Sequence, residues 1–163
     1  MQFAATIDYP ADVETVAAML ADEEFAGARA ERAGSLEHRV EVHREGRAFT
    51  VTTRMKMPTT IVPAAFRSLV GDSLDVRMVE AWEEPGAGGA RHSTLALDIH
   101  GVPVRVVGTQ RLEATSAGCT ETYAGEVTAS VPLFGGPIEE AAVRTVQQVV
   151  DVERELGLEH LAR

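Results

Sequence analysis

The sequence contains one cysteine, Cys119, and no apolar run that approaches the roughly 20 residues of a membrane-spanning helix. A single cysteine excludes an intrachain disulfide and a thiolate metal cluster within the chain. The N-terminus has neither the basic start nor the apolar segment of a secretory signal. We therefore expect a cytoplasmic protein without stable membrane insertion.

Basic residues are also scarce, since 15 arginine and lysine residues stand against 25 aspartate and glutamate residues, and lysine occurs only at Lys56. The resulting net charge of −10 repels phosphate backbones and anionic lipid surfaces, so we expect no nucleic-acid partner. Aromatic residues make up only 5% of the chain. Few side chains are therefore large enough to fill a gap in the interior.

The common catalytic and metal-binding motifs are absent. The five histidines form no HExxH or similar pair, and no GxSxG segment supplies a nucleophilic serine. Gly135 and Gly136 precede a helix, but no Lys-Ser or Lys-Thr follows them, and Glu139 and Glu140 place negative charge where a phosphate would bind. The sequence predicts no metal, no cofactor and no catalytic set.

The most informative segment runs from Ser130 to Leu156. Pro132 and the glycine pair end a strand, and Pro137 is suited to the first turn of a helix. Helical spacing then gathers one apolar stripe, with Ala141, Val146 and Glu153 at its flanks: Ile138, Ala142, Thr145, Val149, Val152 and Leu156. Such a stripe must be buried, and most of residues 35–131 alternate like strands, so the partner is a sheet.

The order of the predicted elements defines the fold class. A short strand that ends at Tyr9-Pro10 is followed by two small helices, the first capped by Asp12, and then by six alternating strands with short links. A short helix around residues 63–70 interrupts the series. We expect one α+β domain over residues 1–163, with a curved antiparallel sheet of about seven strands wrapped around the C-terminal helix, which is the helix-grip fold.

This pattern and several segments resemble the superfamily of START lipid-transfer domains, polyketide cyclases and Bet v 1-type allergens (SRPBCC). The segments are Tyr9-Pro10, Val70-Gly71-Asp72, Glu80-Ala81-Trp82, GVPVRVVGT at 101–109 and SVPLFGGPIEEA at 130–141. More closely, the chain resembles an uncharacterised bacterial family within that superfamily. The resemblance implies a cavity for an apolar small molecule between sheet and helix, but no shared catalytic residues.

Six polar residues share the inward phase of the strands or the helix stripe: His38, Thr53, Glu80, Gln110, Tyr123 and Thr145. Buried polar groups need partners, so these residues pair with one another, with water or with a ligand, or they lie near strand ends where the sheet opens to water. Met55, Met57, Met78 and Trp82 fit an adaptable pocket, although ordinary core packing is favoured. Asp98 and His100 are expected on the exposed face.

Small residues are predicted to face one another, because Ala141, Ala142 and Thr145 on the helix oppose Gly108, Gly125 and Ala129 on the sheet. Either the helix sinks into a dense core, or curvature holds it away and leaves a cavity, which we favour. The predicted ligand-binding residues are His38, Thr53, Met78, Glu80, Trp82, Gln110, Tyr123, Thr145 and Val149.

Three functions remain open. The first is binding of a hydrophobic or amphipathic small molecule by a monomer or weak homodimer. The second is a cyclase or dehydratase acting on a polyketide-like substrate, in which Glu80 or His38 moves protons and Tyr123 or Thr145 orients a carbonyl. The third is a protein-interaction module with an exposed apolar surface.

Overall fold

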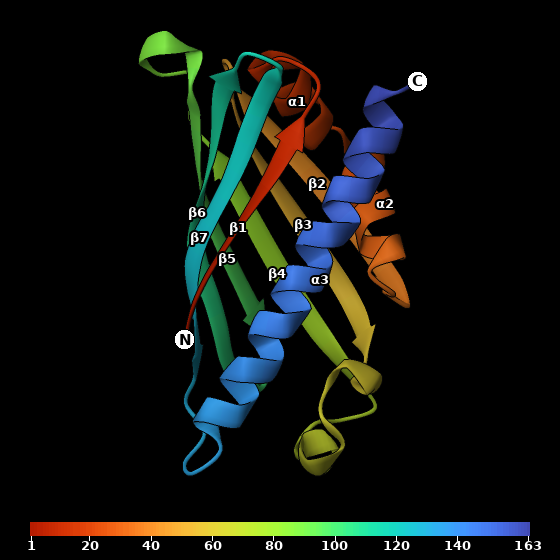
Figure 1. The fold of residues 1–163 in the computed structure, drawn as a ribbon. Helices are drawn as coiled ribbons and strands as arrows, with labels where there is room; N and C mark the ends of the chain where they lie inside the picture. The colour runs from red at the N-terminus through yellow and green to blue at the C-terminus, as the bar shows by residue number, and fades with distance from the viewer.

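A seven-stranded sheet curves around one long helix in the computed structural model, which describes residues 1–163 (Figure 1). All neighbouring strands are antiparallel, in the spatial order β1-β7-β6-β5-β4-β3-β2. The strands are β1 (Gln2–Tyr9), β2 (Glu37–Glu45), β3 (Ala48–Pro58), β4 (Ser73–Trp82), β5 (Arg91–Ile99), β6 (Val102–Thr115) and β7 (Gly118–Ala129). The helices are α1 (Val13–Leu20), α2 (Glu23–Arg32) and α3 (Gly135–Leu161). The α+β helix-grip fold expected from the element order is confirmed.

The two small helices begin where acidic caps predict. The Asp12 carboxylate accepts a hydrogen bond from the Thr15 backbone N–H at 2.7 Å, and Asp22 caps α2 by accepting from the Glu24 N–H at 2.9 Å. Each cap satisfies one of the backbone donors that a helix leaves unpaired in its first turn. The split pair of helices after the first strand is therefore a consequence of local sequence.

The long helix begins slightly earlier than the sequence suggests. β7 ends at Ala129 and α3 starts at Gly135, so the glycine pair lies inside the first turn and Pro137 is the third helical residue. Proline is tolerated there because the first four N–H groups of a helix have no intrahelical partner. Glu139 then accepts a hydrogen bond from the Ala129 N–H at 3.0 Å, which ties the start of α3 to the end of β7.

The crossover between β3 and β4 contains two short 3-10 helices, η1 (Thr59–Ile61) and η2 (Ala64–Leu69), in place of one helix. A third, η3 (Ala87–Gly89), lies in the glycine-rich loop before β5. In Figure 1, η1 and η2 lie at the same end of the molecule as the start of α3, opposite α1. This end is where the interior opens, as described below.

α3 and α2 cover different parts of the concave face. α3 packs against β1 and β7, whereas α2 packs against β2 and β3, and the two helices contact each other (Figure 1). The main core of 23 buried residues joins α1, α2 and α3 to the sheet and runs along the length of β6 and β7, and a smaller cluster of Met57, Leu74 and Val76 lies towards η1 and η2.

β2 is less buried than the alternation predicts. Val40 and Val42 are half-buried, but Leu36 and His38 are exposed, so His38 has the predicted inward phase without being buried. β2 is an edge strand whose inner side is covered by α2: a Cβ added at Gly27 of α2 would lie 3.2 Å from His38 Nε2. The alternation itself persists, but α2 covers this end of the strand only in part, and His38 does not line the cavity.

Candidate functional site

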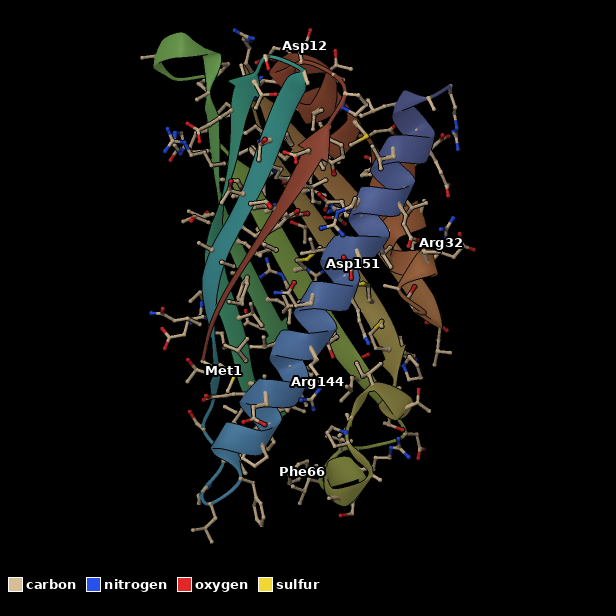
Figure 2. All side chains as sticks on the ribbon, in the orientation of Figure 1. Met1, Asp12, Arg32, Phe66, Arg144 and Asp151 are labelled. Carbon is tan, nitrogen blue, oxygen red and sulfur yellow. The ribbon has the colours of Figure 1, made fainter.

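A cavity of about 400 Å³ lies between the sheet, α2 and α3. Hydrophobic residues make up 27 of the 35 that line it, and they come from β3 to β7, from η1 and η2, and from both helices. The helix α3 contributes a continuous inner face through Ile138, Ala142, Val146 and Val149. Figure 2 shows Arg144 and Asp151 on the opposite, exposed face of α3. The part of the amphipathic stripe from Ile138 to Val149 thus forms one wall of this cavity, whereas Val152 and Leu156 pack in the main core.

Six of the predicted ligand-binding residues line the cavity: Thr53, Met78, Glu80, Tyr123, Thr145 and Val149. The other three do not. His38 is exposed beside α2; Trp82 is buried in the main core, where its ring stacks on Phe49 with centroids 6.0 Å apart; and Gln110 lies behind Glu80, to which it donates a hydrogen bond. For Trp82 and Gln110 the inward phase is correct, but they lie beyond the closed end of the cavity.

Small residues on the sheet do not create the space, contrary to the expectation. Gly108 and Gly125 face each other on β6 and β7, where a Cβ on Gly108 would lie 2.6 Å from the Ala124 carbonyl oxygen. A Cβ on Gly125 would lie 2.6 Å from the Phe3 ring. These glycines allow close packing of neighbouring groups. The cavity exists because α3 lies over β1 and β7 and α2 lies over β2 and β3, which leaves the inner face of β4 and β5 without a helix directly on it.

Aromatic residues meet across the mouth of the cavity. Phe66 of η2, labelled in Figure 2, lies at this end. Its ring contacts that of Phe134, which directly precedes α3, with centroids 5.6 Å apart in an edge-to-face arrangement. Leu69 and Leu133 are exposed at the same end, at 64% and 95% of their full areas. The entrance is therefore apolar and closed mainly by side chains.

The inner end of the cavity is polar. Eight buried residues from seven elements form a connected group that we term the polar cluster: Tyr9, Arg29, Glu80, Ser93, Gln110, Glu121, Tyr123 and Glu153. Four of its members also line the cavity, namely Arg29, Glu80, Tyr123 and Glu153. A ligand that enters from the mouth would meet this group last.

Arg29 is the centre of the polar cluster. Its Nη2 donates to Glu80 Oε2 at 2.8 Å and its Nη1 to Glu80 Oε1 at 3.4 Å, while Nη1 also makes an ion pair with Glu153 Oε2. Burial alone would lower the pKa of Arg29, but the charges of Glu80 and Glu153 raise it well above its usual range. The guanidinium thus stays charged, and both of its terminal nitrogens are occupied.

Neutral groups complete the cluster. The hydroxyls of Tyr123 and Tyr9 donate to Glu153 Oε1 at 2.8 and 3.2 Å, and burial raises the pKa of both phenols so that they remain donors. The Gln110 amide donates to Glu80 Oε1 at 3.0 Å and to Glu121 Oε1 at 3.3 Å. Most buried polar atoms therefore have partners, as a stable interior requires.

The pKa values of two carboxyl groups in the cluster are shifted in opposite directions. Burial raises the pKa of Glu121 well above its usual range, and the charge of Glu153 raises it further. For Glu153, burial acts in the same direction, but the positive charge of Arg29 and hydrogen bonds from its neighbours outweigh it and lower the pKa. The cluster thus contains two carboxylates paired with Arg29 and one carboxyl group that favours its neutral form.

The sequence-based prediction missed the residues that matter most here. Arg29 lies on the same helical face as Phe25, Ala26 and Ala30, which is a detectable sign of a buried arginine. Glu121 has the same phase in β7 as Tyr123, but the inward set for that strand began at Tyr123. Glu153 was placed only at the flank of the α3 stripe, and it is 2% exposed.

No group of three or more His, Cys, Asp or Glu side chains is arranged to hold a metal ion, and none of the helices is long and apolar enough to cross a membrane. Asp98 and His100 are exposed, as their strand phase predicts. The cavity and its polar end are therefore the features on which a function can be based.

Several solved structures share this fold. The protein TTHA0849 from Thermus thermophilus superposes with a TM-score of 0.61 at 14% identity, covering 98% of this chain and 97% of that one. A STAR-related lipid transfer protein from Xanthomonas axonopodis gives 0.55 at 17% identity over 94% and 85% of the two chains. Ara h 8.0201 gives 0.53 at 10% identity over 98% of both.

These similarities confirm the START and Bet v 1-like fold that the sequence suggested. At such low identities they establish the fold alone, since one fold hosts many functions. The comparison with curated proteins gave no match. The profile of one protein family matches residues 4–161, nearly the whole chain, and the protein therefore belongs to the family described as "Protein of unknown function (DUF2505)".

Proposed function

We propose that the protein binds a hydrophobic or amphipathic small molecule in the cavity between the sheet and α3. The observation that carries this proposal is an interior space of about 400 Å³ with 27 hydrophobic residues among the 35 that line it. Small-molecule sites commonly have volumes of roughly 300–1,000 Å³ and mostly apolar walls with a few polar groups. Both properties are found here.

The free energy gained by filling an apolar cavity supports a bound ligand. The walls of an empty apolar space lose dispersion contacts, and a ligand that fills the space restores them while burying its own apolar surface. Few aromatic side chains are available to fill the space from within, and two of the largest, Trp82 and Phe49, stack on each other in the main core. One structure of the same fold is described as a lipid transfer protein, which supports this class of function without identifying the ligand.

Catalysis has less support than binding. The enzymatic hypothesis requires a side chain that exchanges protons with a substrate, and His38 does not line the cavity. Glu80 does, but both of its oxygens accept hydrogen bonds from Arg29. Tyr123 donates to Glu153, and Thr145 donates to the Ala141 carbonyl of its own helix. We therefore propose a binding protein, with no assigned reaction.

The test measures binding of an uncharged apolar dye, Nile red, to delipidated protein by fluorescence. Ala142→Phe places a larger side chain inside the cavity, so we expect it to weaken dye binding at least several-fold. Gln148→Phe adds the same group at an exposed position of the same helix and serves as the matched control. Equal binding by wild type and Ala142→Phe would show that the dye does not occupy the cavity and would refute the proposal.

Native mass spectrometry of freshly purified protein provides a second measurement. A co-purified small molecule should be present in wild type and reduced in Ala142→Phe, with Gln148→Phe unchanged. Melting curves of all three proteins show whether each variant is folded before its binding is compared.

A further inference from the structure

The polar end of the cavity defines which head group a ligand can carry. This step rests on the proposed binding function and concerns the chemistry of the ligand. Five polar residues face this end of the cavity: Arg29, Thr53, Glu80, Tyr123 and Glu153. All five are at least 94% buried, so a head group that reaches them leaves water almost completely. Its charge and hydrogen bonds must then be satisfied by these side chains.

A carboxylate head group finds no free cation there. Arg29 is the only basic residue that lines the cavity, and both of its terminal nitrogens already bind Glu80 and Glu153. A ligand carboxylate that made a two-point contact with the two terminal nitrogens would have to displace one of these glutamates, and the unpaired Nε–H offers only a single further contact. The displaced glutamate would then be a buried charge without a partner, which is strongly unfavourable.

The net charge at this end of the cavity also disfavours an anionic head group. One guanidinium is paired with two carboxylates, which leaves an excess of one negative charge beside the cavity. An anionic head group would be repelled, and the repulsion is stronger in a buried site than in water because the effective dielectric constant is lower. Fatty acids and other anionic lipids are therefore poorly suited to this cavity.

Two hydrogen-bonding groups at the same end have no partner. These are the Thr53 hydroxyl and the Arg29 Nε–H, both buried. Thr53 on β3 and Glu80 on β4 are diagonal neighbours on the inner face, since Thr53 pairs with Met78 and Glu80 with Val51. Glu80 Oε2 accepts only one hydrogen bond, from Arg29, and so retains a free lone pair. Donors and an acceptor are thus available within one small region.

We infer that the cavity selects an uncharged amphipathic molecule with a hydroxyl at its inner end, such as a long-chain or cyclic alcohol, and discriminates against carboxylates. A hydroxyl can accept a hydrogen bond from Thr53 or Arg29 Nε and donate one to Glu80, so it can satisfy both kinds of group. A ketone or ether can only accept. An ammonium can only donate, and it would lie beside the Arg29 guanidinium.

The test compares ligands that share one alkyl chain: dodecanol, dodecanoate, dodecylamine and dodecane. The displacement of Nile red from delipidated protein by each ligand is measured at neutral pH. We expect dodecanol to bind roughly tenfold or more tightly than dodecanoate, which corresponds to the loss of one good buried hydrogen bond or more. Dodecanoate or dodecylamine binding as tightly as dodecanol would overturn the inference.

Two variants locate the discrimination. Thr53→Val removes the hydroxyl at nearly constant side-chain shape. It should therefore weaken the binding of dodecanol roughly tenfold and leave the binding of dodecane unchanged. Thr52→Val, on the outer face of the same strand, is the control and should change neither. Glu80→Gln removes the excess negative charge and frees part of Arg29, so dodecanoate should bind more tightly than it does to wild type. If Glu80→Gln does not fold, the Thr53 and Thr52 variants still decide the question, because unchanged dodecanol binding by Thr53→Val contradicts the inference.

The two proposals fail in different ways. If none of the four ligands displaces the dye, and Ala142→Phe binds the dye as wild type does, the cavity is not a binding site. If the dye and dodecane bind but dodecanoate equals dodecanol, the binding function stands and the selection of a hydroxyl is wrong.

Discussion

Glu121→Gln tests the electrostatic account of the polar cluster. Glu121 is fully buried, its Oε2 atom has no hydrogen-bond partner, and burial together with the nearby charge of Glu153 raises its pKa. A glutamine has nearly the shape of the protonated acid and cannot ionise. The substitution therefore removes the titration of this group while it keeps the packing and the hydrogen bond from Gln110.

The sign of the effect follows from proton linkage. Because the pKa of Glu121 is higher in the folded than in the unfolded protein, the stabilisation by this group is complete below the unfolded pKa of about 4.3 and is lost as the pH rises towards the folded pKa. Within that window the folded state holds one more proton than the unfolded state. The free energy of unfolding then falls by about 1.4 kcal/mol per pH unit on account of this group.

We therefore expect Glu121→Gln to become progressively more stable relative to wild type as the pH rises above the unfolded pKa, by up to about 1.4 kcal/mol per pH unit. The pH at which the difference stops growing marks the folded pKa. Glu153 contributes no slope in this window, because its pKa is lowered and it is ionised in both states. Arg29 is likewise charged, and the phenols of Tyr9 and Tyr123 neutral, throughout it.

The assay is urea unfolding followed by circular dichroism at a series of pH values for wild type and variant. Glu126→Gln changes an exposed glutamate on the outer face of the same strand and controls for the loss of one surface charge. Stability curves of wild type and Glu121→Gln that run parallel with pH would refute the reasoning, since they would mean that Glu121 ionises alike in both states.

Three further substitutions or reactions test the packing. Gly157→Ala should destabilise the protein by about 1–3 kcal/mol in urea unfolding, because the new Cβ would lie 2.6 Å from the Tyr9 ring, whereas Gly136→Ala in the same helix meets nothing within 4 Å and should be neutral or stabilising by up to about 1 kcal/mol. Equal effects of the two would contradict the packing of α3. The Cys119 thiol, whose pKa burial raises to about 11, should react with a thiol reagent only after unfolding; rapid reaction of the native protein would contradict its burial. Arg29→Met leaves two buried carboxylates without a counter-charge and should cost about 3–5 kcal/mol in the same unfolding assay, and a loss below about 1 kcal/mol would show that they are not held as charges.

Sequence periodicity was most reliable in the central strands. In β3 and β4, the alternation correctly assigned Thr53, Met78 and Glu80 to the inner face, because both strands have neighbours on each side and one face covered. At His38 the same rule gave the right face, but the side chain is exposed beside α2 and does not reach the cavity, because β2 is at the edge of the sheet. Alternation identifies two faces of a strand but does not say how far along the strand a face is covered.

The polar cluster shows a second limit. The partners of Arg29 are Glu80, 51 positions away, and Glu153, 124 positions away. Each residue by itself has a local sign of burial, yet a charged residue at the flank of an apolar stripe is more often exposed, because burying a charge is costly without a partner. Only the partner makes burial acceptable, and partners so distant in sequence cannot be paired from periodicity.

The sequence by itself determined the order of the elements, the inner face of each central strand and the amphipathic stripe of α3, because hydrogen-bonded periodicity, caps and turn residues act between near neighbours in the chain. The tertiary structure decided where the cavity lies, which inward residues reach it and that Arg29 joins two glutamates at its closed end. These features depend on the curvature of the sheet and on the lateral positions of α2 and α3, which result from packing between distant segments. The small residues at Gly108 and Gly125 illustrate the difference: their sequence suggested empty space, and the fold uses them for close contact between strands and with Phe3.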